Sequence, residues 1–314
     1  MTWPWAAPRL ALATALLSCL GCRSSAHTPV HESSPAGRAQ PAPVIAFCST
    51  REDPKGDIYT ISARGRGARP VAAGEGAQTD PAWSPDGRQL AFASRQPGVW
   101  DIFICDPDGR NLRNFTHSLN SDRHPDWSPD GRLLAYDSRG RGGAVIKVKA
   151  IDDGEPLTLT DGYGSDTHPS WSPDGSRLVF DSGRGGTAQL YTMNADGSDQ
   201  RLLRTGELRA TDPDWSPAND QIAFVGGIGS GTRIYLVRAD GSGLRRLTDS
   251  DWTERDPTWS PDGTQIAYAA QPGADWDLHA MGVAGGKVRR VAASPAKEVC
   301  AAWRTLPPEE GGPR

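Results

Sequence analysis

Residues 256–263 read Asp-Pro-Thr-Trp-Ser-Pro-Asp-Gly, and residues 80–87 repeat this stretch with Ala in place of Thr. Its tryptophan recurs every 44 residues along the chain, as Trp83, Trp127, Trp171, Trp215, Trp259 and Trp303. Two apolar series keep the same step, one beginning at Leu90 and one at Ile58. Three series in phase identify an internal repeat, which has to be recognised before single strands are assigned.

Two turns divide each repeat. Residues 84–87, Ser-Pro-Asp-Gly, combine a proline that presets φ with a glycine that accepts a positive φ, as a tight hairpin requires. A second turn contains Asp108 and Gly109 and follows a short run of aromatic and β-branched residues. The runs between turns predict four antiparallel strands in each repeat. A period in the low forties with four strands is typical of a β-propeller blade.

The two ends of the repeat region complement each other. The first copy begins at residues 44–49 as a second strand without its tryptophan strand, and the last copy stops just after Trp303. We therefore expect the C-terminal strand to join the N-terminal strands in one shared blade, which closes a ring and removes free sheet edges. The predicted fold is all-β, a six-bladed β-propeller of four-stranded antiparallel blades over residues 43–306.

The composition agrees with a folded, turn-rich chain. Of 314 residues, 36 are Gly and 26 are Pro, which together stay below the ~25–30% typical of low-complexity disorder. The 11 tryptophans provide apolar material for a core. A net charge of −4 without a basic run argues against a nucleic-acid partner.

The repeated stretch resembles the repeat of TolB-type six-bladed propellers, and the resemblance covers residues 43–306. Related propellers serve as envelope scaffolds, as regulatory domains of peptidases and in some polysaccharide lyases, so the resemblance is specific for the fold rather than the function. It implies that the innermost strand of each blade begins three residues before the tryptophan. Six side chains should then ring the channel mouth: Asp80, His124, His168, Asp212, Asp256 and Cys300.

Five members of this ring are candidate ligands for a divalent metal. Imidazole suits Zn or Mn and carboxylate suits Mn or Ca, and the candidates are His124, His168, Asp80, Asp212 and Asp256. The alternative is that each side chain satisfies backbone donors of its own connection. No other cofactor is expected. The repeated tryptophans are expected to pack between neighbouring sheets as structural residues.

Arginines mark the loops between the second and third strands, which should rise on the same face as the ring. They are Arg51, Arg95, Arg139, Arg141 and Arg184. An arc of arginines is suited to a carboxylate or to an acidic partner surface. The opposite side carries acidic and aromatic residues, namely Asp251, Trp252, Asp275 and Trp276. The alternative is that these loops are simply solvated.

Cys48 and Cys300 fall on strands that should be adjacent across the closure, where a disulfide could lock the ring. No Gly-x-Ser-x-Gly nucleophile elbow is present. Ser165, Asp166 and His168 are too close in sequence to form a triad. We therefore assign no catalytic residues.

Residues 1–22 have the form of a lipoprotein-type signal peptide: Arg9, an apolar run over 10–17, then small residues and two cysteines. Cys22 is the favoured lipidation site because polar residues then open the mature chain. Cys19 is the alternative, as is secretion without a lipid. Residues 23–42, rich in Ser, Pro and Ala, predict a disordered tether, and residues 307–314 a disordered tail.

Together these patterns predict a non-catalytic scaffold on the periplasmic side of a bacterial envelope. We expect a monomer held by its N-terminal lipid alone, at the outer membrane, that binds an envelope protein or a peptidoglycan or other glycan component on its top face. The alternative is a metal-dependent, polysaccharide lyase-like or glycan-binding propeller with His124 and His168 as metal ligands.

Overall fold

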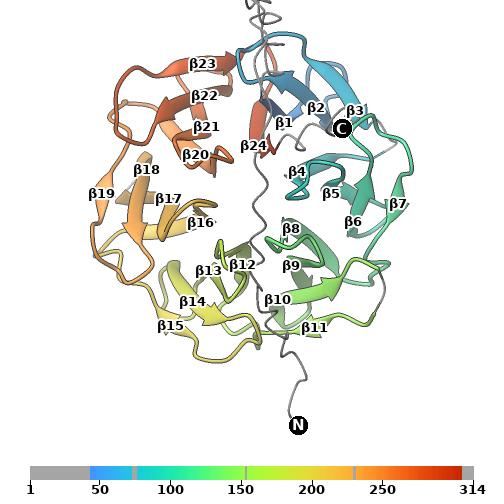
Figure 1. Cartoon of the computed structure of the whole chain (residues 1–314), viewed down its shortest axis with the longest axis vertical. Coiled ribbons are helices and arrows are strands. Elements are labelled where there is room, and N and C mark those ends of the chain that lie inside the picture. The colour runs from blue at the N-terminus through green and yellow to red at the C-terminus, as the bar shows by residue number, and fades with distance from the viewer. Residues whose placement is uncertain (1–42, 73–75, 153, 229–230, 306–314) are drawn as a thin grey trace, which may run out of the picture. The chain divides into compact units, whose positions relative to one another are not determined.

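The computed structural model describes residues 43–72, 76–152, 154–228 and 231–305. The predicted signal peptide, tether and tail, with Cys19 and Cys22, lie outside the described residues. The described part holds six four-stranded antiparallel sheets and no helix, arranged around a central channel (Figure 1). The predicted six-bladed propeller is confirmed. Because the described residues form no helix, none of them forms a helical segment that could span a membrane.

Each blade runs from an innermost strand beside the channel to an outermost strand at the rim (Figure 1). The innermost strands are β4 (Gln78–Trp83), β8 (Ser121–Trp127), β12 (Asp166–Trp171), β16 (Arg209–Trp215), β20 (Thr253–Trp259) and β24 (Glu298–Arg304). The second strands are β5 (Leu90–Arg95), β9 (Leu133–Gly140), β13 (Arg177–Ser182), β17 (Gln221–Ile228), β21 (Gln265–Gln271) and β1 (Val44–Ser49). The third strands are β6 (Trp100–Cys105), β10 (Gly143–Ala150), β14 (Gln189–Asn194), β18 (Gly231–Arg238), β22 (Asp277–Gly282) and β2 (Asp57–Ser62). The outermost strands are β7 (Arg113–Asn114), β11 (Leu157–Thr158), β15 (Arg201–Leu202), β19 (Arg245–Arg246), β23 (Arg289–Ala292) and β3 (Arg69–Ala72).

Blade 1 combines the two ends of the repeat region, in the order β24-β1-β2-β3. Blades 2 to 6 follow in chain order from β4–β7 to β20–β23. In blade 1, Ile45 of β1 lies opposite Trp303 of β24. The predicted closure by a shared blade is therefore confirmed.

The Ser-Pro-Asp-Gly turn connects the innermost strand to the second strand. In the first copy, Ser84 Oγ donates to Asp86 Oδ1 at 2.6 Å and accepts the Gln89 N–H at 2.9 Å. Gly87 has φ of 66°, and a Cβ there would lie 2.0 Å from the Thr305 carbonyl oxygen, so the turn needs glycine. We call the side of the ring with these turns the turn face. The opposite side, with the loops between second and third strands, is the mouth face.

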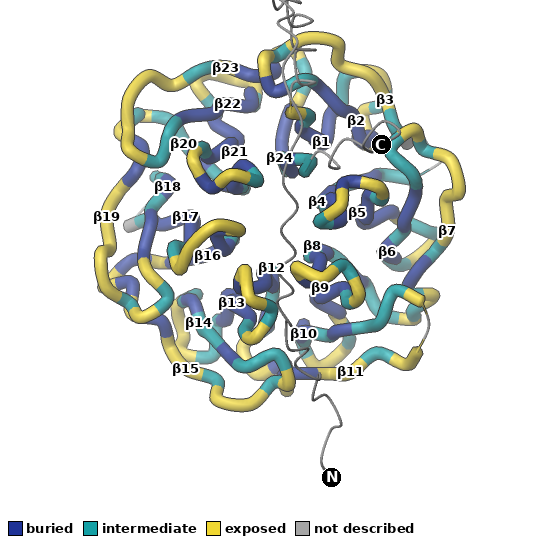
Figure 2. Tube along the Cα trace, in the orientation of Figure 1, coloured by how far each residue is buried: buried dark blue, intermediate teal, exposed yellow. Residues whose placement is uncertain are grey.

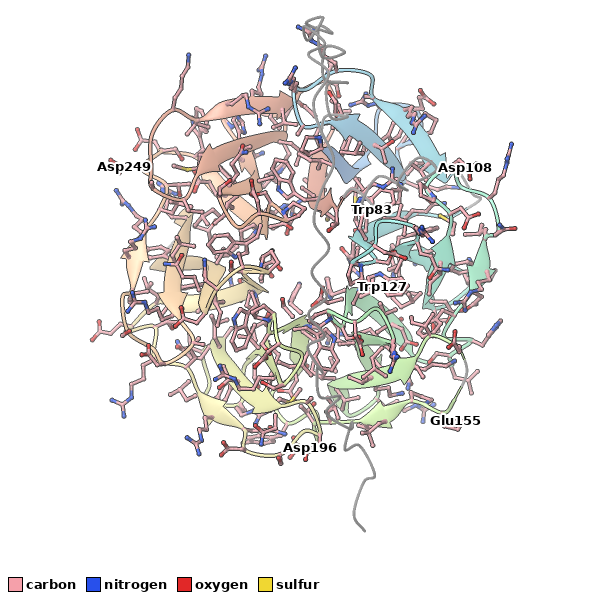
Figure 3. The ribbon with its side chains drawn as sticks, viewed as in Figure 1. Trp83, Asp108, Trp127, Glu155, Asp196 and Asp249 are labelled. Atoms are coloured by element: carbon pink, nitrogen blue, oxygen red, sulfur yellow. The ribbon has the colours of Figure 1, made fainter. Side chains whose placement is uncertain are left out.

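The repeated tryptophans pack between neighbouring blades, as expected. Trp259 is 4% exposed and lies in one buried cluster with Val225 and Leu236 of blade 5 and Tyr268 of blade 6. Trp83 and Trp127 lie toward the channel, whereas Asp108, Glu155 and Asp196 lie at the rim (Figure 3). Buried residues follow the inner strands of each blade, and exposed ones lie at the rim and on the hairpins between innermost and second strands (Figure 2). The core is thus a ring of interfaces between blades.

Candidate functional site

The six ring positions share one unusual backbone conformation. Their φ values lie between 50° and 55°, in the left-handed region that Asp and His enter more readily than most residues. Each position lies at a bulge in the innermost strand, where the pairing register shifts, as between Thr79 and Ala82 in β4. Proline follows in five of the six copies, and because it has no N–H, the unpaired position loses no ladder hydrogen bond. The fold therefore turns these side chains out of the regular pleat.

The ring lines a pocket of about 230 Å³ at the channel mouth, together with the residues that follow it in each innermost strand. All six ring positions contribute to the lining: Asp80, His124, His168, Asp212, Asp256 and Cys300. The structure places the six ring positions at the channel mouth, as expected. Its members differ in what they contact.

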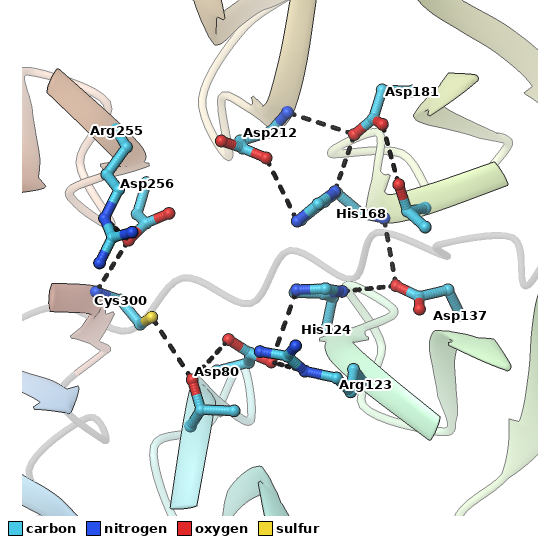
Figure 4. A network of polar contacts seen from close by, with 12 residues as sticks. Asp80, Arg123, His124, Asp137, His168, Asp181, Asp212, Arg255, Asp256 and Cys300 are labelled. Atoms are coloured by element: carbon cyan, nitrogen blue, oxygen red, sulfur yellow. Dashed lines mark hydrogen bonds and ion pairs between the residues drawn. The ribbon is translucent and has the colours of Figure 1, made fainter. Parts of the chain in front are cut away.

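Two imidazoles lie against each other, tilted by 39°, on one side of the ring (Figure 4). The rings of His124 and His168 have their centroids 3.8 Å apart. His124 places Nδ1 2.6 Å from Asp137 Oδ1 and Nε2 3.5 Å from Asp80 Oδ2. His168 places Nδ1 2.8 Å from Asp181 Oδ1 and Nε2 3.2 Å from Asp212 Oδ1. Each imidazole is therefore held between two carboxylates.

Asp137 and Asp181 also connect neighbouring blades. The backbone N–H of His168 donates to Asp137 Oδ1 at 3.3 Å, and that of Asp212 donates to Asp181 Oδ1 at 3.2 Å. One carboxylate thus orients the imidazole of its own blade and fixes the bulge of the next. Sequence reasoning missed both aspartates, although they are 44 residues apart and each follows its histidine by 13 residues.

Charges around the pair shift the protonation of its members. Burial disfavours an imidazolium, but the carboxylates of Asp212 and Asp181 outweigh it and raise the pKa of His168 well above its ordinary value. Burial raises the pKa of Asp212 to about 6, against the attraction of His168. Burial acts in the same direction on Asp80, yet His124 and Arg123 hold the pKa of that carboxyl far below its usual range. The side of the ring with the imidazoles therefore carries fixed charge of both signs.

Two arginines on opposite sides of the ring support neighbouring aspartates. Arg123 lies over the Trp100 ring at 4.9 Å and places Nε 3.1 Å from Asp80 Oδ2. Arg255, three blades away, lies over Trp276 at 4.2 Å with Nε 3.4 Å from Asp256 Oδ2. Stacking on an aromatic ring limits the motion of each guanidinium and adds cation–π attraction.

Polar residues lie one position before four of the tryptophans, and those before Trp127, Trp171 and Trp215 each accept a backbone N–H from the next blade. Asp126 Oδ2 accepts the Trp171 N–H at 2.7 Å, and Asp214 Oδ2 accepts the Trp259 N–H at 2.7 Å, each from the next blade. Burial, with Asp214 nearby, raises the pKa of Asp126 to about 7. These contacts join adjacent blades, and the sequence analysis did not single them out.

The five predicted arginines divide into two groups. Arg51 pairs with buried Glu298 at 2.9 Å, and Arg184 pairs with buried Asp166 at 2.8 Å, each over an aromatic ring of its own blade. These two therefore stabilise loops. The side chains of the other three are exposed on the mouth face: Arg95, Arg139 and Arg141.

The two cysteines at the closure are free thiols. Cys48 Sγ lies 3.6 Å and Cys300 Sγ 3.5 Å from the same hydroxyl, Thr79 Oγ1. Both sulfurs thus face one point on blade 2, and the disulfide between them stays a prediction.

Only some of the predicted metal ligands come together. Among the described residues, one group can place a ligand atom of each member within 4.8 Å of the others, and it consists of His168, Asp181 and Asp212. Asp80, His124 and Asp256 are outside this group, and Asp181 was not predicted.

Comparisons with known proteins agree with the fold. The family described as the TolB beta propeller domain matches residues 42–158 and 125–306. TolB from Acinetobacter baumannii is 21% identical, with a TM-score of 0.74, over 83% of this chain and 66% of that one. A TolB-type protein from Agrobacterium tumefaciens is 24% identical, with a TM-score of 0.66, over 80% of this chain and 88% of that one.

A more distant likeness is to an oligogalacturonate lyase solved in complex with manganese. It is 15% identical, with a TM-score of 0.53, over 78% of this chain and 72% of that one. At these identities the likenesses concern the fold. The chain spans just under two thirds of the Acinetobacter protein. No curated protein sequence matches it.

Proposed function

The chain belongs to the family of TolB β-propeller domains, and we propose that it is a non-catalytic protein of the bacterial envelope whose mouth face binds a partner protein. The observation that carries the proposal is that the imidazoles of the ring already have partners within the protein. Both nitrogens of His124 and of His168 face carboxylates of the protein itself. These internal ion pairs explain both imidazoles as structural groups of the ring, without a substrate. The exposed arginines of the same face are suited to a protein surface.

The proposed location is the periplasmic side of the envelope, with a lipid on Cys22 as the anchor to the outer membrane. This part of the proposal rests on the sequence of residues 1–22 and on the family. Membrane fractionation of cells that express the full chain tests it. The wild type should sediment with outer membranes and Cys22→Ser should not, whereas loss of sedimentation with Cys19→Ser alone would move the anchor to Cys19.

The binding face is tested with matched loop insertions. Gly98 and Gly273 lie in mouth-face loops and Gly285 in a turn-face loop, and a Cβ on any of the three would meet no atom within 4 Å. A flexible insert of about eight residues is therefore tolerated at each. We expect an insert after Gly98 or Gly273 to lower the capture of partner proteins from an envelope extract, and the same insert after Gly285 to leave it unchanged. Equal capture by all three would contradict the proposal.

A metal-dependent activity on acidic polysaccharides is the second candidate. It is favoured by the group of His168, Asp181 and Asp212, whose donor types suit Mn or Zn. Because a metal must displace the proton from His168, whose pKa is raised by the neighbouring carboxylates, affinity should rise as the pH increases through that pKa. Titration calorimetry with Mn²⁺ tests this, with His168→Asn as the control. Heat that is absent, or equal in the two proteins, would exclude the site.

A further inference from the structure

Two apolar side chains are conspicuously exposed on the mouth face. Leu119 is 97% exposed and Tyr163 is 72% exposed, the highest values among the large hydrophobic residues of the described chain. Single exposed apolar residues are ordinary. These two, however, lie on corresponding loops, between β7 and β8 and between β11 and β12, that flank the same hairpin.

That hairpin joins β9 to β10 and fills the space between the two loops. A Cβ on Gly140 would lie 3.0 Å from Asn120 Oδ1, beside Leu119. On the other side, a Cβ on Gly143 would lie 2.7 Å from the Gly162 carbonyl oxygen, beside Tyr163. The three segments therefore form one continuous surface, which we call the basic hairpin surface: Leu119, Arg139, Arg141 and Tyr163.

The charge of this surface is unbalanced. Arg139 and Arg141 are exposed at the hairpin tip, and no described residue forms an ion pair with either. Asp161 is the exposed carboxylate of the flanking loops, and its Oδ1 accepts the N–H of Tyr163 at 3.0 Å. The corresponding loop of blade 4 differs, because there Arg184 is paired with buried Asp166.

We propose that the basic hairpin surface is the docking site for an acidic protein segment that carries apolar side chains beside its carboxylates. The inference rests on the proposed function and specifies the partner's chemistry. Two free guanidiniums are complementary to carboxylates, and Leu119 and Tyr163 offer apolar contact area on either side of them. Tyr and Arg are the residue types that most often dominate binding energy at interfaces. Carboxylates would also steer the partner to this side of the ring.

Photocrosslinking in cells that express the full chain tests the location and the chemistry together. We place p-benzoylphenylalanine at Leu119, at exposed Ala274 on the opposite side of the mouth face, and at exposed Ala218 in the turn between β16 and β17 on the turn face. We expect crosslinks from position 119, and mass spectrometry of the crosslinked peptide should show an excess of Asp and Glu. Crosslinks to a basic segment or to lipid would overturn the inference.

The remaining outcomes separate the inference from the proposed function. Crosslinks from position 274 alone would overturn this docking site and leave a mouth-face partner in place. Crosslinks from position 218 alone, or from none of the three, would contradict both.

Charge reversal measures the same contact by its strength. The double change Arg139→Glu with Arg141→Glu should weaken capture of the crosslinked partner at least about tenfold, as expected for a binding hot spot. Arg132→Glu is the matched control, because Arg132 is exposed at the turn-face end of the same blade. Arg139→Lys should retain most of the binding. An equal loss in Arg132→Glu would overturn the inference.

Discussion

The tryptophan level and the mouth ring lie three residues apart in every blade, yet the residue type is constant at the first and variable at the second. At the tryptophan level all six residues are the same, all are at most 8% exposed, and each packs between two sheets. At the mouth ring the backbone is equally constant, with φ between 50° and 55°, but the residues are three Asp, two His and one Cys. The fold fixes the backbone at both levels and fixes the side chain only where it fills the interface between blades. The mouth ring is therefore the level at which blades can differ without loss of the fold.

Truncation at the tryptophan level should have the largest effect. Trp259→Ala removes a buried indole whose Nε1 donates to the Asp214 carbonyl at 2.9 Å. We expect a loss of about 3–5 kcal/mol in the free energy of unfolding, the usual cost of such a truncation. Urea denaturation followed by circular dichroism measures it. Trp259→Phe should recover most of the loss, and a cost below about 1 kcal/mol for Trp259→Ala would mean that the blades do not depend on this contact.

A disulfide between Cys300 of the mouth ring and Cys48 should have the next largest effect on stability. Oxidation by a small disulfide such as oxidised glutathione should join Cys48 to Cys300 and release two equivalents of thiol. The crosslink would connect the two ends of the propeller, for which about 2–4 kcal/mol is typical. Thermal unfolding with and without reductant tests it, with peptide mapping to locate the bond. A Cys48→Ser variant that shows the same oxidation-dependent stabilisation would rule out this pair.

The carboxylate behind one histidine comes third. Asp181→Asn keeps the shape of the side chain but removes a charge 2.8 Å from His168 Nδ1. Because the carboxylate is buried and the imidazole is only partly exposed, we expect a loss of about 1–3 kcal/mol. The pKa of His168 should also fall, while Asp212 still holds it above its ordinary value, and NMR titration of the imidazole measures this change. Glu207→Gln, at an exposed position between β15 and β16, is the control. An unchanged His168 titration would show that Asp181 has no such role.

Much of this comparison could be predicted from the sequence, because it depends on spacing. The 44-residue step of Trp83 to Trp303 predicts the blades, and the complementary ends of the repeat region predict the closure. The resemblance to TolB-type propellers implies the positions of the ring. The contacts of the ring could not be predicted in the same way. Asp137 and Asp181 sit on second strands that are otherwise mostly apolar and buried, so the strand pattern assigns them no partner. The bulge at His124 and His168 brings the imidazoles onto them. Arg51 and Arg184 lie in the same kind of loop as Arg95, but each forms an ion pair with a buried carboxylate, Glu298 of β24 and Asp166 of β12.

The free energy of unfolding should depend on pH through His168, on the side of the mouth ring that carries the imidazoles. Since the pKa of His168 in the folded chain is raised above its ordinary value, its stabilising contribution is complete below about pH 6.5 and is lost as the pH rises through the folded-state pKa. The free energy of unfolding should fall over that window in the wild type, and His168→Gln should remove this part of the slope. Denaturation curves at pH 6, 7, 8 and 9 measure it. A slope that His168→Gln leaves unchanged would assign the pH dependence to other groups.

The smallest effect on stability is expected at the basic hairpin surface. Arg139→Glu and Leu119→Ala change exposed side chains that do not contribute to the core, so each should alter the free energy of unfolding by no more than about 0.5 kcal/mol. The same changes should strongly lower partner capture. Trp259→Ala should do the reverse: it lowers stability, but the fraction of that variant that is folded should capture the partner normally. A loss of more than about 2 kcal/mol for either variant would place the hairpin among the structural residues, because exposed positions reach that value only when they hold part of the fold together. In that case only the mouth ring could vary without loss of stability, and the loops of the mouth face would belong to the structural part of the propeller.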